Sequence, residues 1–350
     1  MLAYYLIICL IIGCIVIKLD TPKLELPMLY MIGIVLVCFA GFRGIGVDRD
    51  IMNYWNMFDY SESLSDFPNQ EVMAKLIPIS LKFVGIYSFG VAILVFAILS
   101  VSLKIYAIKK YSYARLASVL YFFSWLFLLQ DFTQIRAAVA VGILLFAVQD
   151  IYHRNLFRFI FKVGLACLFH YSSLLIVPLY FVSKENLNKK VYLIMLGIFI
   201  ILGLQKSINI FTIIPGLTAM SSKLNTYMLY QGFTTINVIN INSLIQVTLV
   251  VILVLNYDVI KQYSKYSVIF IKQSYFSCLS YFVLSAVPVL AFRVSELYAI
   301  ANIITVSYFC VVFKKSSYFW GFIIVLSLTL LSLNLFKQNL VNEYVSRFSF

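Results

Sequence analysis

Long apolar runs recur along the whole chain, separated by short polar segments. Each run is about 15 to 20 residues long, which is the length, or nearly the length, that an α-helix needs to cross a hydrocarbon core of about 30 Å. In lipid the backbone polar groups must be satisfied within the segment, so such runs are expected to be helices. The pattern therefore predicts an all-α polytopic membrane protein.

We place about ten transmembrane helices on these runs, at residues 2–17, 27–42, 86–103, 114–130, 136–151, 191–205, 241–256, 274–292, 297–313 and 317–336. Residues 157–182 lie between two basic segments that both favour the cytoplasm, and we interpret them as a re-entrant hairpin that turns near His170. Residues 1–350 are expected to form a single multi-span membrane domain, with a GT-C-like architecture as one candidate.

Basic residues fall mainly in the short segments between the predicted spans. The chain has 27 Lys and Arg against 14 Asp and Glu, and an excess of basic residues in short loops is typical of the cytoplasmic side. This placement argues against nucleic acid as a partner. The residues concerned are Lys104, Lys109, Lys110, Arg115, Arg154, Arg158, Lys162, Lys261, Lys265, Lys272, Lys314 and Lys315. The orientation leaves two long extracytoplasmic loops, at about residues 43–85 and 205–242.

Three arginines, Arg43, Arg136 and Arg293, lie at the predicted outer boundary of the membrane. Ionisable groups at such positions are costly and are candidates for a functional site. Three guanidinium groups that converge on one face would suit a phosphate or pyrophosphate, because arginine stays charged and binds two oxygens at once. The alternative is that each arginine reaches lipid headgroups or pairs locally, as Arg293 would with Glu296 three residues later.

Two residues are candidates for a general base. Asp48 lies beside cations at the end of the second apolar run, where a carboxylate can take a proton from a sugar hydroxyl. The alternative is an ordinary solvated loop acid. His170 interrupts an apolar run and is followed by Ser172 and Ser173, which favours a position at a polar cavity. A lone histidine is, however, more often a structural group than a catalyst.

The sequence predicts neither a disulfide framework nor a metal site. All six cysteines lie in apolar runs without a CxxC motif, and no histidine lies at ligand spacing from them. We therefore expect the cysteines to be small buried apolar residues, and we expect no cofactor.

The order of four short motifs resembles the EpsG-type branch of the Wzy polysaccharide polymerases, and the resemblance covers nearly the full chain. The motifs are Arg43-x2-Gly46-x-Asp48 with Tyr54 and Phe58, Gln134-Ile135-Arg136 before small apolar residues, Phe169-His170-Tyr171-Ser172-Ser173-Leu174, and Arg293 near a late span.

The resemblance implies a multi-pass enzyme of the bacterial inner membrane whose active face is periplasmic. Such an enzyme polymerises undecaprenyl-pyrophosphate-linked oligosaccharide repeat units into O-antigen or capsular polysaccharide, together with a flippase and a chain-length regulator. On this view Arg43, Arg136 and Arg293 bind the pyrophosphate, and the base is Asp48 as first candidate and His170 as second. The supporting residues are then Gln134, Tyr54, Glu296 and Ser172.

Three other classes of protein are alternatives to a polymerase. An O-antigen ligase shares the donor and the need for arginine but differs in the acceptor. A membrane acyltransferase that modifies the polysaccharide would use a histidine base and an acyl donor on the cytoplasmic side. A flippase or transporter of the lipid-linked oligosaccharide is expected to carry charges in the middle of its spans and an internal repeat, and neither is clear in this chain.

Overall fold

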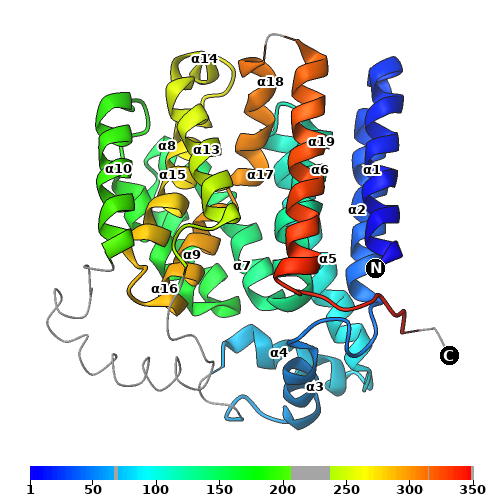
Figure 1. The fold of residues 1–350 in the computed structure, drawn as a ribbon. Helices are drawn as coiled ribbons and strands as arrows, with labels where there is room; N and C mark the ends of the chain where they lie inside the picture. The colour runs from blue at the N-terminus through cyan, green and yellow to red at the C-terminus, as the bar shows by residue number, and fades with distance from the viewer. Residues whose placement is uncertain (67–69, 206–236, 314, 348–350) are drawn as a thin grey trace, which may run out of the picture. The chain divides into compact units, whose positions relative to one another are not determined.

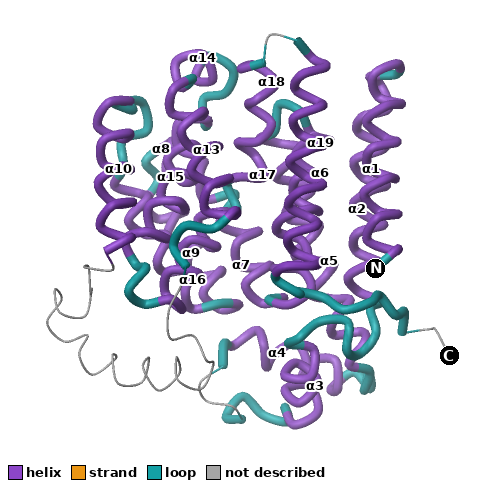
Figure 2. Tube along the Cα trace, in the orientation of Figure 1, coloured by secondary structure: helices purple, strands orange, loops and turns teal. Residues whose placement is uncertain are grey.

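The described part of the chain is entirely helical apart from its connecting segments. A computed structural model gives the fold, and it describes residues 1–66, 70–205, 237–313 and 315–347. Within these ranges Figure 2 shows helices and loops but no strand, and only two isolated β-bridges occur, Arg43–Ser346 and Asp48–Val341. The all-α class predicted from the apolar runs is therefore confirmed.

The chain divides into two compact units. The first contains Met1–Leu174 and Val306–Phe350, and the second contains Leu175–Thr305. The single membrane domain expected from the sequence stays a prediction.

The first unit contains the long helices at both ends of the chain (Figure 1). Its elements are α1 (Leu2–Asp20), the 3₁₀ turn η1 (Pro22–Leu24), α2 (Glu25–Gly41), α3 (Ile51–Tyr60), α4 (Val72–Phe83), α5 (Phe89–Tyr111), α6 (Arg115–Phe122), the π-helix η2 (Phe123–Thr133), α7 (Ile135–Leu144), α8 (Ala147–His153), α9 (Leu156–Phe169), η4 (Val306–Tyr308), α18 (Phe309–Val312), α19 (Ser316–Ser332) and the π-helix η5 (Leu333–Lys337).

The second unit contains shorter helices. They are α10 (Lys189–Gln205), α13 (Ile241–Leu255), α14 (Tyr257–Lys261), α15 (Ser267–Val283), α16 (Pro288–Ala299) and α17 (Asn302–Thr305). The 3₁₀ helix η3 (Tyr171–Phe181) runs from the first unit into the second.

Six helical segments of the described chain are long and apolar enough to cross a membrane: Leu2–Asp20, Pro22–Gly41, Phe89–Tyr111, Arg115–Thr133, Ile135–His153 and Ser316–Lys337. A seventh is added if α16 and the segment Asn302–Val312, which meet at a bend of 43°, form one broken span. The protein is therefore a multi-pass membrane protein, but the described residues show six or seven candidate spans where we expected about ten.

The expected spans that are missing fall in the second unit, where the helices are too short. α10 has 17 residues, α13 has 15 and α15 has 17. The predicted span 274–292 is interrupted after Val283, and Pro288 begins the next helix at its first position. Proline lacks an N–H and is tolerated in the first turn of a helix, so an apolar run that contains it need not be one helix.

The apolar run 157–182 is interrupted at His170, as expected. α9 ends at Phe169, His170 has an extended backbone, and η3 begins at Tyr171. This places the imidazole at the end of a helix and not within one. The re-entrant course proposed for the run stays a prediction.

Two lysines that we assigned to cytoplasmic loops are buried inside helices instead. Lys104 is buried in α5 and pairs with Asp131, with 2.6 Å between Nζ and Oδ2. Lys272 is buried in α15 and donates to the carbonyl of Asn186 at 2.5 Å. These loop assignments were wrong because a lysine with a partner inside the fold does not mark the end of a helix.

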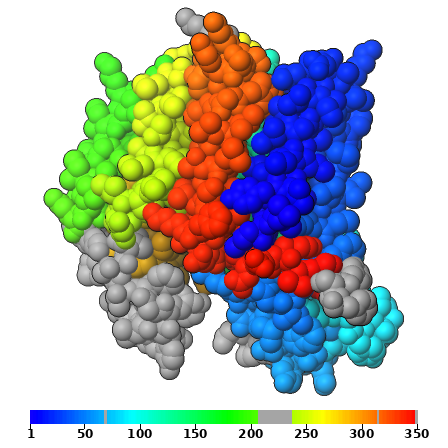
Figure 3. Space-filling view, turned by 45° about the vertical axis from the view of Figure 1, so that its right-hand side comes forward, coloured from blue at the N-terminus to red at the C-terminus, as the bar shows by residue number. Residues whose placement is uncertain are grey.

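The predicted loop 43–85 carries the short helices α3 and α4, which lie at one end of the long helices of the first unit (Figure 1). The described C-terminal residues, 338–347, cross the same end (Figure 3). Close packing of α2 on α5 sets the start of this loop, because a Cβ on Gly41 would lie 2.5 Å from the Leu94 side chain. The other predicted loop, 205–242, falls mostly on residues 206–236, outside the described residues.

Candidate functional site

Arg43 and Asp48 form a buried ion pair at the end of α2. The Nε of Arg43 lies 2.8 Å from Oδ2 of Asp48, and neither side chain has exposed area. Nη1 of Arg43 donates to the carbonyl of Ala40 at 2.6 Å, and Nη2 donates to the carbonyl of Phe132 at 2.6 Å. All three nitrogens of the guanidinium are thus occupied by groups of the protein.

The Asp48 carboxylate is equally occupied. Its Oδ2 accepts from Arg43, and its Oδ1 accepts from the backbone N–H of Asp50 at 3.0 Å. A general base needs a lone pair within reach of the substrate proton, and both oxygens of Asp48 are already bonded and buried. The predicted roles of Arg43 in pyrophosphate binding and of Asp48 as base stay predictions, and this geometry favours a structural role for both.

The C-terminal segment, residues 338–347, holds the loop that carries this pair. The N–H of Gly44 donates to Val345 at 2.7 Å, the N–H of Asn342 to Val47 at 2.8 Å, and the N–H of Arg347 to Phe42 at 2.9 Å. Gly46, at φ +90°, adopts a backbone conformation that suits glycine, and its carbonyl accepts from the Asn342 amide at 2.8 Å. The loop is therefore fixed by residues that are about 300 positions away in sequence.

A second cluster joins three different helices through Glu71, the residue before α4. Oε1 of Glu71 lies 2.8 Å from Nδ1 of His170, which follows α9. Its Oε2 accepts from Nη1 of Arg136, in the first turn of α7, and Nη1 also donates to the side-chain oxygen of Gln70. The Glu71 side chain is 7% exposed and those of Arg136 and His170 are each 22% exposed. We call Glu71, Arg136 and His170 the bridged triad.

The Glu71 carboxylate is ionised within this cluster. Burial opposes ionisation, but the hydrogen bond from His170 and the charge of Arg136 together outweigh it and hold the pKa of Glu71 below its usual value. An ionised carboxylate only accepts hydrogen bonds, so Nδ1 of His170 carries the hydrogen. Nε2 is then the nitrogen that can take up a proton.

Tyr54, on α3, packs against the same guanidinium. The Arg136 guanidinium lies 5.6 Å from the centre of the Tyr54 ring, and the Tyr54 hydroxyl donates to the carbonyl of Thr133 at 3.0 Å. Burial raises the pKa of Tyr54 to about 12 although Arg136 opposes the shift, so the phenol stays protonated near neutral pH. Nε of Arg136 is buried and has no hydrogen-bond partner in the part of the chain that the structure describes.

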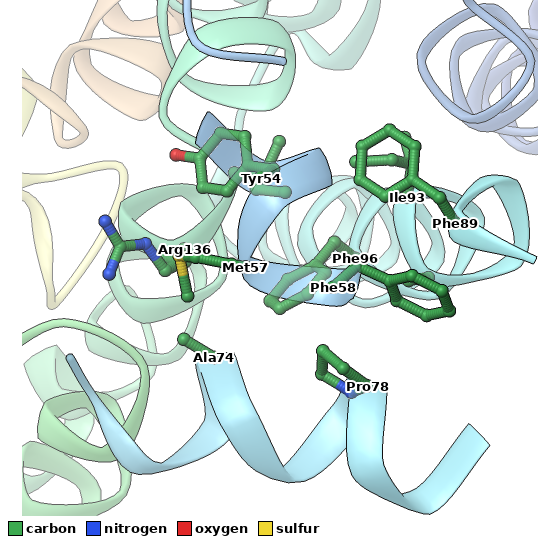
Figure 4. Close-up of a pocket in the computed structure, with 11 residues that line it drawn as sticks. Tyr54, Met57, Phe58, Ala74, Pro78, Phe89, Ile93, Phe96 and Arg136 are labelled. Atoms are coloured by element: carbon green, nitrogen blue, oxygen red, sulfur yellow. The ribbon is translucent and has the colours of Figure 1, made fainter. Parts of the chain in front are cut away.

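An apolar pocket lies beside the triad, and Figure 4 shows Arg136 and Tyr54 together at one end of it, with their polar atoms pointing the same way. Its lining residues come from α3, α4, α5 and α7: Tyr54, Met57, Phe58, Ala74, Pro78, Phe89, Ala92, Ile93, Phe96, Ile135 and Arg136. Arg136 and Tyr54 both turn their polar atoms away from the other lining residues (Figure 4), so the pocket itself is almost entirely apolar.

The structure brings Arg136, His170 and Tyr54 together, and Arg43 and Asp48 adjoin them through the end of η2. Gln134 is the residue before α7, with no capping hydrogen bond from its side chain, and Ser172 lies on η3 two residues after His170. Arg293 and Glu296 lie on α16, in the second unit. The convergence of Arg293 with the other arginines stays a prediction.

Glu71 and Gln70 were missed in the sequence, where Glu71 resembled the other acids of the loop 43–85. A usable signal was its position immediately before an amphipathic stretch at Val72–Phe83, because a carboxylate is favourable at a helix start. Among the described residues no group of three or more His, Cys, Asp and Glu could hold a metal ion.

The chain was compared with known proteins. No curated protein and no solved structure matches it. The EpsG family matches residues 27–348, which include every residue of the clusters described above. The four motifs that carry the resemblance all fall within that range. The protein thus belongs to the EpsG family, whose members are multi-span membrane proteins linked to exopolysaccharide synthesis.

Proposed function

We propose that the protein is a membrane glycosyltransferase that polymerises undecaprenyl-pyrophosphate-linked oligosaccharide repeat units at the extracytoplasmic face of a bacterial inner membrane. The observation that carries the proposal is the bridged triad, in which one carboxylate holds both a histidine and an arginine. This arrangement supplies the two groups that such a transfer needs, a base for the acceptor hydroxyl and a cation for the departing pyrophosphate.

In the proposed reaction the hydroxyl oxygen of the acceptor sugar attacks the anomeric carbon of the donor glycan. The bond from that carbon to the phosphate oxygen breaks, and undecaprenyl pyrophosphate leaves with the bonding electron pair. Nε2 of His170 takes the hydroxyl proton, while Glu71 holds the imidazole through Nδ1 and stabilises the imidazolium that forms. Arg136 stabilises the negative charge that grows on the pyrophosphate.

The proposed roles differ from those expected from the sequence in two respects, the arginine that binds the pyrophosphate and the residue that acts as base. Arg136 takes the pyrophosphate role, because its side chain is partly exposed, whereas the Arg43 guanidinium is fully buried and bonded to groups of the protein. His170 is preferred over Asp48 as base because its side chain is partly exposed, whereas that of Asp48 is fully buried.

The proposal is tested by the length distribution of surface polysaccharide in cells that lack the gene and are complemented with variants of equal membrane abundance. Arg136→Ala and Arg136→Lys are both expected to abolish the ladder and leave single repeat units, because a lysine cannot reproduce a bidentate phosphate contact. Arg158→Ala, at an exposed position on α9, is the matched control and is expected to leave the ladder intact.

Other outcomes point to the other classes. Complete loss of surface glycan in the gene deletion, with the lipid-linked unit retained inside, would indicate a flippase. A normal polymer that accumulates on undecaprenyl pyrophosphate would indicate a ligase. An unchanged ladder with altered acylation would indicate an acyltransferase. A full ladder with Arg136→Ala would remove Arg136 from the reaction.

A further inference from the structure

Three consecutive residues at the end of the π-helix η2 are each held by a side chain from a different element. Lys104 on α5 pairs with the Asp131 carboxylate at 2.6 Å. Nη2 of Arg43 donates to the Phe132 carbonyl at 2.6 Å, and the Tyr54 hydroxyl donates to the Thr133 carbonyl at 3.0 Å. We call Lys104, Arg43 and Tyr54 the clamp.

The backbone at this point needs such support. A π-helix bonds each N–H to the carbonyl five residues earlier, and such turns are rare and recur at functional sites. η2 ends at Thr133, where the N–H of Gln134 is shared between the carbonyls of Leu129 at 3.2 Å and Gln130 at 3.0 Å. The carbonyls at the end of a helix have no partner within it. Two of them, those of Phe132 and Thr133, accept hydrogen bonds from Arg43 and Tyr54.

Burying the Lys104–Asp131 ion pair costs desolvation free energy. The pair is therefore expected where the position of the helix end matters. Both side chains are fully buried within candidate membrane spans, and the ammonium lies 5.2 Å from the ring of Phe122. A buried ion pair gives little net stability compared with apolar residues of the same volume, and its best attested use is to fix a register. Oδ1 of Asp131 has no partner in the described part of the chain, so the pair is not an optimised stabilising contact.

Arg136 follows the clamped residues by three positions, in the first turn of α7. Any rotation or shift of the backbone at the end of η2 therefore moves the Arg136 guanidinium. We propose that the clamp is a positioning device: Lys104, Arg43 and Tyr54 fix residues 131–133 so that Arg136 meets Glu71. The expected effect on catalysis rests on the proposed function. The positioning of Arg136 does not depend on it.

The first test measures amide hydrogen exchange of the purified protein in detergent. Tyr54→Phe removes one donor and keeps the ring, while Lys104→Met/Asp131→Leu removes the ion pair without leaving an unpaired buried charge. Both are expected to raise exchange at residues 134–138 while the rest of the first unit stays protected. The matched control, Lys162→Met/Asp150→Leu, removes the ion pair between α9 and α8 and is expected to leave residues 134–138 unchanged. Unchanged exchange in both clamp variants overturns the proposal.

The second test measures kcat/KM for extension of repeat units carried on undecaprenyl pyrophosphate. A displaced guanidinium is expected to lower kcat/KM about tenfold to a hundredfold in the clamp variants, with thermal midpoints like that of the control variant. Full activity with local exchange raised would also overturn the inference, because Arg136 would then not depend on the clamp. If Arg136→Ala itself is active, the proposed function fails, and the exchange experiment still decides whether the clamp positions this segment.

Discussion

The Glu71 carboxylate holds His170 through one oxygen and Arg136 through the other. A single isosteric substitution of Glu71 can therefore disturb the contacts of both side chains. Glu71→Gln keeps the volume but loses the charge, and the amide presents an N–H to one of two donors. We expect chain extension to fall about a hundredfold or more. The measurement is kcat with lipid-linked repeat units, with Glu62→Gln, at an exposed loop position, as control. Equal rates for the two variants would show that the bridge is not used in the reaction.

The same carboxylate makes stability depend on pH in a defined direction. The pKa of Glu71 is lower in the folded protein than its ordinary value of about 4.3. Its contribution to folding stability is therefore fully present above that value and is lost as the pH falls through the folded pKa. The difference in thermal midpoint between the native chain and Glu71→Gln is therefore expected to shrink as the pH falls below about 4.3, where the native carboxylate becomes protonated. A difference that does not shrink in this acidic range would contradict the assignment.

Arg43 and Asp48 are expected to respond as structural residues. Arg43→Met leaves the Asp48 carboxylate buried without a partner, which costs about 3–5 kcal/mol, and less folded protein should be found in the membrane. The double variant Arg43→Met/Asp48→Leu should recover much of that loss. Inserted protein and thermal midpoint are measured in parallel. Normal abundance of Asp48→Asn with no chain extension would instead return Asp48 to the role of base.

At the scale of elements, α2 and α5 approach each other closely at Gly41, which sets the direction from which the Arg43 loop leaves the bundle. Gly41→Ala would place a Cβ 2.5 Å from Cδ1 of Leu94 and 3.3 Å from its Cα, so the Leu94 side chain must move and the backbones must give by a few tenths of an ångström. We expect a loss of about 1–3 kcal/mol in thermal unfolding. Gly13→Ala, on α1 with open space around it, is the control and is expected to stabilise by up to about 1 kcal/mol. A stabilised Gly41→Ala variant would show that this contact is loose.

Elements were predictable where an apolar run was long and uninterrupted, as for α1, α2, α5 and α19. They were not predictable where tertiary partners decide the outcome. Lys104 looks like a loop residue because its partner, Asp131, lies 27 positions later and on another helix. Glu71 looked like a solvated acid because its role arises only when α4, α7 and α9 meet. Arg136 and His170 were identifiable because each interrupts an apolar pattern.

For the whole molecule, the site lies at one end of the long helices of the first unit, and the side of the membrane on which that end lies decides the chemistry. The proposed function requires this end to be extracytoplasmic. In a cysteine-free background, Ser63→Cys in the segment between α3 and α4 is expected to react with a membrane-impermeant thiol reagent in intact cells. Lys23→Cys, in η1 between α1 and α2, is expected to react only after the membrane is opened. The reverse pattern would exclude a polymerase at this site.

The pairing of residues 338–347 with the Arg43 loop has a consequence for biosynthesis. The Arg43 carbonyl accepts from Arg347, 304 residues later, so the loop stays without this partner until those residues have been made. At about 5 to 20 residues per second this wait lasts about 15 to 60 s. The ribosome therefore completes this end of the first unit only after it has made the second unit. A chain released before residues 338–347 would carry the Arg43 loop without these partners, and we expect it not to extend glycans.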